Sequence, residues 1–160
     1  MSIAIIRNLA DQESNRILTI MKSDYTFNYH LFLKWVGDEV VLAGYPPDAE
    51  SHRGLYGIRI SKDTKCAIAY IGKTENDNRV LHHVLGVNKN GTDLANSQGN
   101  KNNQIRRAIA TGFDIQLCLF RDPDLDKPTL ACIEIACIQK AMADFKDTFP
   151  DLDHWNRRLG

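Results

Sequence analysis

The chain has 160 residues, of which 43% are hydrophobic and 25% charged, a size and composition that predict one domain with its own core. Twenty Lys and Arg residues balance twenty Asp and Glu residues, so a nucleic-acid partner would require basic side chains gathered on one face. Lys101, Arg106 and Arg107 are candidates for that face. Apolar runs of only a few residues exclude a membrane-spanning helix, and an N-terminus charged as early as Arg7 does not resemble a signal peptide.

The four cysteines indicate a reducing compartment. Cys66, Cys118, Cys132 and Cys137 lie in apolar surroundings and form no CxxC pair. We therefore expect buried, reduced thiols in a cytoplasmic protein, rather than disulfides or zinc ligands.

The N-terminal third contains one clear helical pattern. Residues 11–21 carry apolar side chains at helical spacing, whereas the aromatic residues 28–36 fit either a helix or a strand. Pro46 and Pro47 then mark a boundary. We divide the chain into an N-terminal extension, residues 1–50, which could contact DNA or serve as an oligomerisation arm, and a core of residues 51–160.

The core is predicted to contain three strands and three helices, which makes a small α/β or α+β domain. Gly112 ends the second of these helices, and Thr129 is the expected N-cap of the third. The strands are expected at residues 55–60, 66–72 and 114–120, the helices at 76–87, 103–111 and 129–145, and a polar loop at 88–103.

Two ionisable residues share one side of the first core helix. Arg79 and His83 are four residues apart, so their side chains lie one above the other on a polar flank. They could face a groove, or they could simply be a solvated helix surface.

Glu134 is the most unusual residue of the last helix. On a helical wheel it lies near the middle of the apolar stripe, close to Leu130, Cys137 and Ala141. A buried carboxylate needs a cation, which could be an Arg or Lys in an ion pair, or a metal ion.

The strands of the core carry a third group of polar residues. Tyr56 and Tyr70 fall on neighbouring strands, where tyrosines usually pack, and Lys73 follows Gly72 at the end of a buried strand. A lysine at that place could favour the charged form of a nearby tyrosine.

In this order the residues resemble the GIY-YIG nuclease family. Gly54-Leu55-Tyr56 resembles the first tripeptide of the family and Tyr70-Ile71-Gly72 matches the second. An Arg, a His, a distal Glu and a terminal Asn follow, here Arg79, His83, Glu134 and Asn156. The resemblance covers about residues 53–158 and is typical of the restriction and phage branches of stand-alone endonucleases.

The resemblance implies a Mg²⁺-dependent endonuclease that hydrolyses phosphodiester bonds of double-stranded DNA, with Mn²⁺ as a substitute ion. It implies a three-stranded central antiparallel sheet flanked by helices. The implied catalytic set is Tyr56, Tyr70, Lys73, Arg79, His83, Glu134 and Asn156, with Glu134 as the metal ligand. A double-strand break would favour a homo-oligomer. Alternatives are an interbacterial toxin or mobile-element nuclease with the same chemistry, or a degenerate module that binds nucleic acid without cleaving it.

Overall fold

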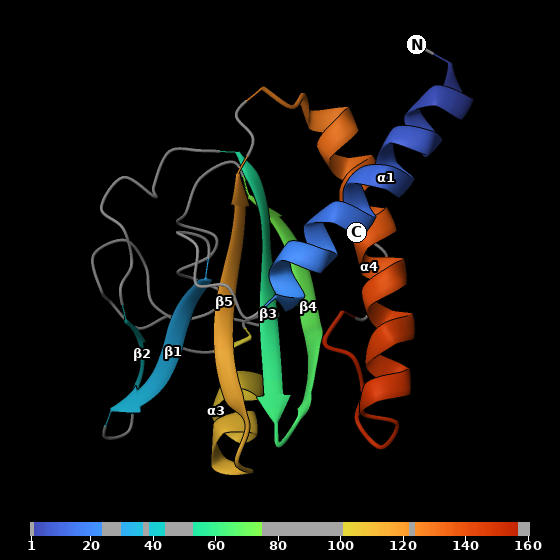
Figure 1. Ribbon diagram of the computed structural model, residues 1–160. Helices are drawn as coiled ribbons and strands as arrows, with labels where there is room; N and C mark the ends of the chain where they lie inside the picture. The colour runs from blue at the N-terminus through green and yellow to red at the C-terminus, as the bar shows by residue number, and fades with distance from the viewer. Residues whose placement is uncertain are drawn as a thin grey trace.

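A computed structural model describes residues 2–23, 30–36, 39–43, 53–74, 101–121 and 124–156 (Figure 1). None of the helices in these ranges combines the length and apolar character needed to cross a bilayer. The elements, in chain order, are α1 (Ile3–Lys22), β1 (His30–Val36), β2 (Glu39–Ala43), β3 (Gly54–Lys62), β4 (Lys65–Thr74), α3 (Asn102–Ala110), β5 (Asp114–Arg121) and α4 (Lys127–Thr148).

The strands form one antiparallel sheet in the order β2-β1-β5-β3-β4. Its members β5, β3 and β4 are the three-stranded antiparallel sheet expected for the core, and helices pack against it, which confirms the α+β class. The ambiguous segment 28–36 contains a strand, β1, which is rich in aromatic and branched side chains that suit a sheet. Together with β2 it extends the sheet beyond β5.

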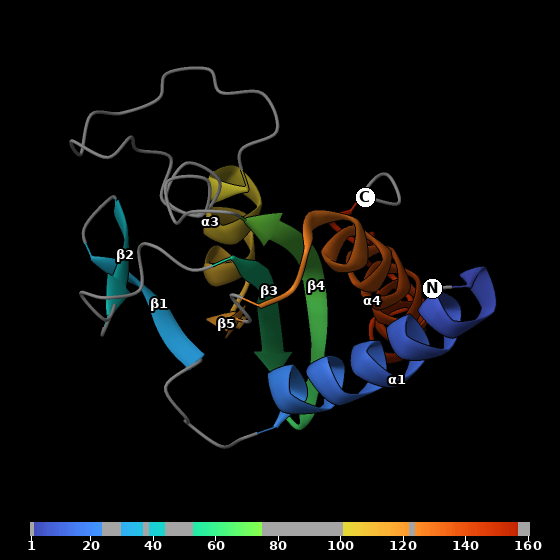
Figure 2. The same ribbon diagram turned by 90° about the horizontal axis from the view of Figure 1, so that it is seen from above.

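Successive side chains of each strand point to opposite sides of the sheet, and both sides are apolar. In Figure 2, α3 lies on one side of the sheet and α1 on the other, while α4 runs beside the edge strand β4. The α3 face contains Tyr56, Ile58, Ile60, Ile115 and Leu117, packed with Ile105 and Ala108 of α3. The α1 face contains Leu55, Ile68, Ile71 and Cys118, packed with Ile17 and Met21 of α1 and with the apolar stripe of α4.

Helix α1 belongs to the packed core. It begins at Ile3, eight residues before the predicted start at 11, because Ser2 caps it by accepting a hydrogen bond from the Ile5 backbone N–H at 3.3 Å. Ile17 and Met21 are buried against the sheet. The predicted division at residue 50 therefore does not separate two packing units within the described ranges.

Helix α4 begins earlier than expected. The predicted N-cap Thr129 is wrong: Asp126 is the cap, and its carboxylate accepts from the Thr129 N–H at 2.7 Å. This hydrogen bond lowers the pKa of Asp126. Pro128 in the first turn suits this start, because the first turn does not need its missing N–H. At the end of α3, Gly112 has φ +91°, as expected for a left-handed cap.

The cysteines follow the prediction in part. All four are free; Cys118 and Cys137 are buried and Cys66 is half-buried. Cys132 is exposed, which contradicts the expected burial, because it faces away from the sheet on α4. Burial raises the pKa of Cys137 to about 12 and raises that of Cys118 further.

Candidate functional site

The two predicted tyrosines meet on the α3 face of the sheet. Tyr56 in β3 pairs with Gly72 in β4, and Tyr70 pairs with Ile58. The two rings lie 5.8 Å apart between centroids, at an interplanar angle of 47°. Tyr56 is fully buried and Tyr70 is 8% exposed, so Tyr70 is the more accessible of the two residues.

Gly72 makes room for Tyr56. A β-carbon at position 72 would lie 2.5 Å from Cζ of Tyr56 and 2.7 Å from its hydroxyl oxygen. Real side chains do not approach this closely, so the ring occupies space that only glycine leaves open. Gly72, the last residue of the second predicted tripeptide, thus makes room for Tyr56, the last residue of the first.

Lys73 lies on the opposite face from the tyrosines. It pairs with Leu55, whose side chain belongs to the α1 face of the sheet. Since successive strand residues point to alternate faces, Lys73 and Tyr70 point in opposite directions. The predicted influence of Lys73 on a tyrosine hydroxyl is therefore not supported by its position.

Another lysine reaches the pair instead. The ammonium of Lys101, just before α3, lies 4.8 Å from the centroid of the Tyr70 ring. It also donates a hydrogen bond to the backbone oxygen of Trp155 at 2.9 Å. Lys101 was predicted to contact DNA; its position at a tyrosine could not be read from the sequence, since 31 positions separate the two residues.

Asn156 closes the free edge of β4. Its Oδ1 accepts from the Ile71 N–H at 2.8 Å, and its Nδ2 donates to the Ile71 oxygen at 2.9 Å. Trp155 extends this pairing by donating its backbone N–H to the oxygen of Ala69 at 2.9 Å. Both polar atoms of the amide are used by the backbone between Tyr70 and Gly72, so Asn156 holds these two residues in place.

His154 fastens the same C-terminal segment. Its Nδ1 accepts from the backbone N–H of Asn156 at 3.2 Å, and its Nε2 lies 3.0 Å from the oxygen of Ile68. This pair of contacts assigns the neutral ring with the proton on Nε2. Burial lowers the pKa of His154, and the charge of Lys101 acts in the same direction. No sequence signal links His154 to β4.

Glu134 is buried on the side of α4 that faces β4. It is 6% exposed and lies within the stripe formed by Leu130, Cys137 and Ala141. Positions around the axis of α4 follow from about 100° of rotation per residue. Lys140, which bonds to Ser14 of α1, lies roughly 120° around the axis from Glu134 in one direction. Met142, which lines a cavity on the α3 face, lies about 80° from Glu134 in the other direction. Glu134 therefore lies between these two flanks, on the side of α4 that packs against β4.

The height of Glu134 along β4 can be estimated from contacts at the far end of the helix. Lys22 contacts Asp144 at 2.7 Å through its ammonium, and Cys66 lies 3.9 Å from the backbone oxygen of Lys22. Asp144 and Cys66 thus both lie at Lys22, at the two ends of its side chain. Glu134 is ten residues earlier, or about 15 Å at 1.5 Å per helical residue, which equals four to five strand residues of roughly 3.3 Å. Since α4 and β4 run in opposite directions (Figure 1), this separation sets Glu134 at about the height of Tyr70 and Ile71 along the strand.

A cavity of about 740 Å³ lies on the α3 face, between α3 and the C-terminal segment 152–156. Its polar lining includes Gln104, Arg107, Asp153, His154 and Asn156. We call it the α3 groove. Arg107 is exposed here, whereas the Nε of Arg106 donates to Oδ1 of Asn102 within α3 at 2.7 Å. Of the three predicted DNA contacts, Arg107 thus faces the groove and Lys101 lies at Tyr70.

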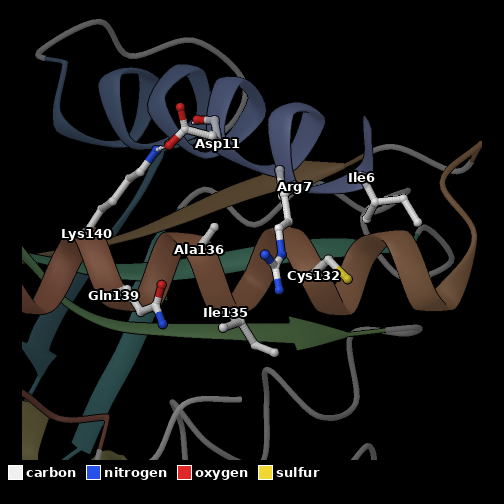
Figure 3. A pocket seen from close by; sticks show the side chains of 9 residues that line it. Ile6, Arg7, Asp11, Cys132, Ile135, Ala136, Gln139 and Lys140 are labelled. Atoms are coloured by element: carbon white, nitrogen blue, oxygen red, sulfur yellow. Dashed lines mark hydrogen bonds and ion pairs between the residues drawn. The ribbon is translucent and has the colours of Figure 1, made fainter. Parts of the chain in front are cut away.

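A second cavity, of about 490 Å³, lies between α1 and α4 (Figure 3). Arg7 reaches across it from α1, and Cys132 and Ile135 line it from α4. At its other end Lys140 reaches Asp11, with 2.8 Å between the ammonium and the carboxylate. This cavity is on the side of α4 turned away from the tyrosines, so it is not part of the candidate site.

The remaining two members of the predicted set, Arg79 and His83, lie outside the described residues, as do the predicted helix 76–87 and most of the loop 88–103. The described part of the chain contains no group of three His, Cys, Asp or Glu residues arranged to hold a metal ion. Glu134 is therefore the one predicted ligand whose surroundings can be assessed.

Comparisons of the chain with protein-family models, with curated proteins and with solved structures find no match. The function must be argued from the side chains that the fold brings together at β4.

Proposed function

We propose that the protein is a Mg²⁺-dependent endonuclease that hydrolyses phosphodiester bonds of double-stranded DNA. The observation that carries the proposal is the assembly at one end of β4. The Tyr56–Tyr70 pair, Lys101 and Asn156 meet there, and α4, which carries the buried Glu134, packs against the same strand. These residues come from four parts of the chain: the β3–β4 hairpin, the start of α3, α4 and the C-terminal segment. Packing of an apolar core does not by itself require polar side chains at these positions.

The chemistry needs a base, a positive charge and a way to hold the phosphate. A tyrosinate would accept the proton of the attacking water, whose oxygen forms a bond to phosphorus. The bond from phosphorus to the 3′ oxygen breaks, and that oxygen leaves with the electron pair and takes a proton from solvent. Arg79 and His83, in line with the family resemblance, would contact the phosphate.

Asn156 would act as a positioning residue. Because Asn156 bonds to the backbone of Ile71, it positions the neighbouring residues Tyr70 and Gly72, and Gly72 makes room for the Tyr56 ring. A displacement of about 1 Å at a reacting group is enough to cost a large fraction of the rate, so such a support matters for catalysis.

Glu134 suits a Mg²⁺ ion of the kind that one carboxylate, water and substrate phosphate hold together. The buried carboxylate within an apolar stripe is consistent with such a ligand. When bound, the ion would supply charge neutralisation at the phosphate. Mn²⁺ would be expected to replace it.

Arg107 and the α3 groove offer a path for the DNA backbone beside Trp155 and Asn156, which bond to the backbone on either side of Tyr70. The chain has zero net charge, so local placement of basic groups would decide the binding. One such site cuts one strand, and a double-strand break would favour a homo-oligomer of this chain. A restriction-type or phage-type role fits this size, and free cysteines fit a cytoplasmic setting. A toxin or mobile-element nuclease would use the same chemistry.

The decisive experiment is plasmid cleavage with Mg²⁺, with Mn²⁺ and with EDTA, using the wild type and Glu134→Gln. This variant keeps the shape of the side chain but loses its charge. We expect a loss of about 100-fold or more in cleavage, with DNA binding by fluorescence anisotropy within about twofold. Glu13→Gln, which changes a glutamate paired with Arg16 on α1, is the matched control. Undiminished cleavage by Glu134→Gln would remove the assigned metal ligand.

One observation favours a second candidate, a module that binds nucleic acid without cleaving it. The Tyr56 side chain is fully buried, so it would have to become accessible to act on water. For this candidate, wild-type protein would bind DNA in the anisotropy assay and leave plasmid intact with every ion tested.

A further inference from the structure

Lys101 and Tyr70 form a specific pair on the α3 face. The lysine nitrogen is 4.8 Å from the centroid of the ring, and its hydrogen bond to the Trp155 oxygen fixes it from the other side. Lys101 is half-buried and Tyr70 nearly fully buried, so the pair is shielded from bulk solvent. Shielding strengthens the interaction between an ammonium and a ring or a phenolate.

The C-terminal segment holds this pair together. Trp155 accepts the hydrogen bond from Lys101, while its own N–H donates to Ala69, the residue before Tyr70. Asn156 fixes Ile71, the residue after Tyr70. The same short segment therefore determines the position of the cation and that of the tyrosine on which it acts.

We infer that Lys101 stabilises the phenolate form of Tyr70, which makes Tyr70 rather than Tyr56 the base of the candidate site. The second clause rests on the proposed endonuclease function, and the first does not. Two further observations agree: Lys73 points to the other face of the sheet, and Tyr56 is fully buried whereas Tyr70 is 8% exposed. In the reaction, the Tyr70 phenolate would take the proton of the attacking water and become the neutral phenol.

The test is a titration of Tyr70 in the full chain labelled with 3-fluorotyrosine, followed by fluorine NMR. The fluorinated phenol ionises at lower pH than tyrosine, which keeps the titration within a range where the protein is folded. Tyr70→Phe identifies the Tyr70 resonance among those of the five tyrosines. We expect the midpoint to move to higher pH in Lys101→Met by about half a pH unit to two units, and to return toward the wild-type value in Lys101→Arg.

A matched control exists in the same domain. Lys62 donates to the backbone oxygen of Thr111 at 2.9 Å and lies 5.1 Å from the ring of Phe113, so it makes the same two kinds of contact with a phenylalanine in place of the tyrosine. Lys62→Met should leave the Tyr70 midpoint unchanged. An unmoved midpoint in folded Lys101→Met overturns the inference whether or not the protein cleaves DNA.

The assignment of Tyr70 as the base is tested by DNA cleavage. We expect Tyr70→Phe to lose about 100-fold or more, and the rising limb of the pH–rate profile to move to higher pH in Lys101→Met, in step with the NMR midpoint. Full activity of Tyr70→Phe would assign the base elsewhere. A shifted NMR midpoint in a protein that cleaves nothing would retain the lysine–tyrosine pair and reject the endonuclease.

Discussion

The ring of Tyr56 occupies the space that a β-carbon at Gly72 would need. The two residues are direct partners across β3 and β4, and the added carbon would lie 2.5 Å from the ring. Both are buried in the same layer as Ile58 and Tyr70. The glycine of one predicted tripeptide is thus required by the packing of the other, independently of any catalytic role.

Gly72→Ala should therefore destabilise the protein. The clash is with a rigid ring inside the sheet, so the chain must shift, and we expect a loss of about 1–3 kcal/mol in the free energy of unfolding, measured by urea denaturation. Gly57→Ala in the neighbouring strand is the matched control. Its β-carbon would lie 2.7 Å from the sulfur of Met21, a flexible side chain that can move, so its loss should be smaller.

The double variant Tyr56→Leu with Gly72→Ala tests the cause. If the ring is the obstacle, adding Gly72→Ala to Tyr56→Leu should cost clearly less than adding it to the wild type. An equal cost in both backgrounds would show that backbone flexibility at position 72, rather than contact with Tyr56, requires the glycine.

The core of this fold could be predicted from the sequence because its signals are local. Alternating and buried strands at 55–60, 66–72 and 114–120, and the helical stripe through Glu134, follow from periodicity, and each has its counterpart in β3, β4, β5 and α4. The start of α4 was misplaced because Asp126 and Thr129 are both good caps. The choice between them depends on Pro128, which fits only in the first turn.

The candidate site was less predictable, since its contacts join distant segments. That Tyr56 and Tyr70 lie on neighbouring strands could be predicted, because a short turn in the sequence joins the two strands. The approach of Lys101 to Tyr70 and the bonding of Asn156 to Ile71 depend on how the chain after α4 returns to β4, and no local pattern encodes that path. The face on which Lys73 lies depends on the register of β4 against β3, which the local pattern does not give.

Asn156 should be needed for stability as well as for position. Asn156→Ala leaves the buried N–H and oxygen of Ile71 without partners, and we expect a loss of about 1–3 kcal/mol in the free energy of unfolding. Asn156→Asp keeps an acceptor for the N–H but sets a carboxylate oxygen against the Ile71 oxygen, so it should be at least as damaging. Hydrogen exchange at the Ile71 amide should accelerate in both variants; unchanged protection would show that this bond is not maintained in solution.

His154 should make stability depend on pH. Burial lowers its pKa from 6.5 in the folded protein, so the folded state favours the neutral ring while the unfolded chain takes up the proton first. The contribution of His154 to the free energy of unfolding is therefore complete above about pH 6.5 and decreases as the pH falls below that value. Protonation of Nδ1 would also abolish its acceptance from the Asn156 N–H. Between about pH 7 and pH 5, His154→Gln should lose less stability than the wild type; equal losses in both proteins would assign the pH dependence to other groups.

The thiols provide an independent check on how α4 packs. Cys132 is exposed on α4, whereas Cys118 and Cys137 are buried, and burial raises the pKa of both buried thiols. Since the thiolate is the reactive form, a thiol reagent at neutral pH should label Cys132 quickly, and label the two buried cysteines only after addition of denaturant. Cys132→Ser should remove the fast phase, and mass spectrometry of peptides would assign the sites. Rapid native labelling of Cys137 would mean that α4 does not rest against β4 by the face that also carries Glu134, and the candidate site would lose its acidic member.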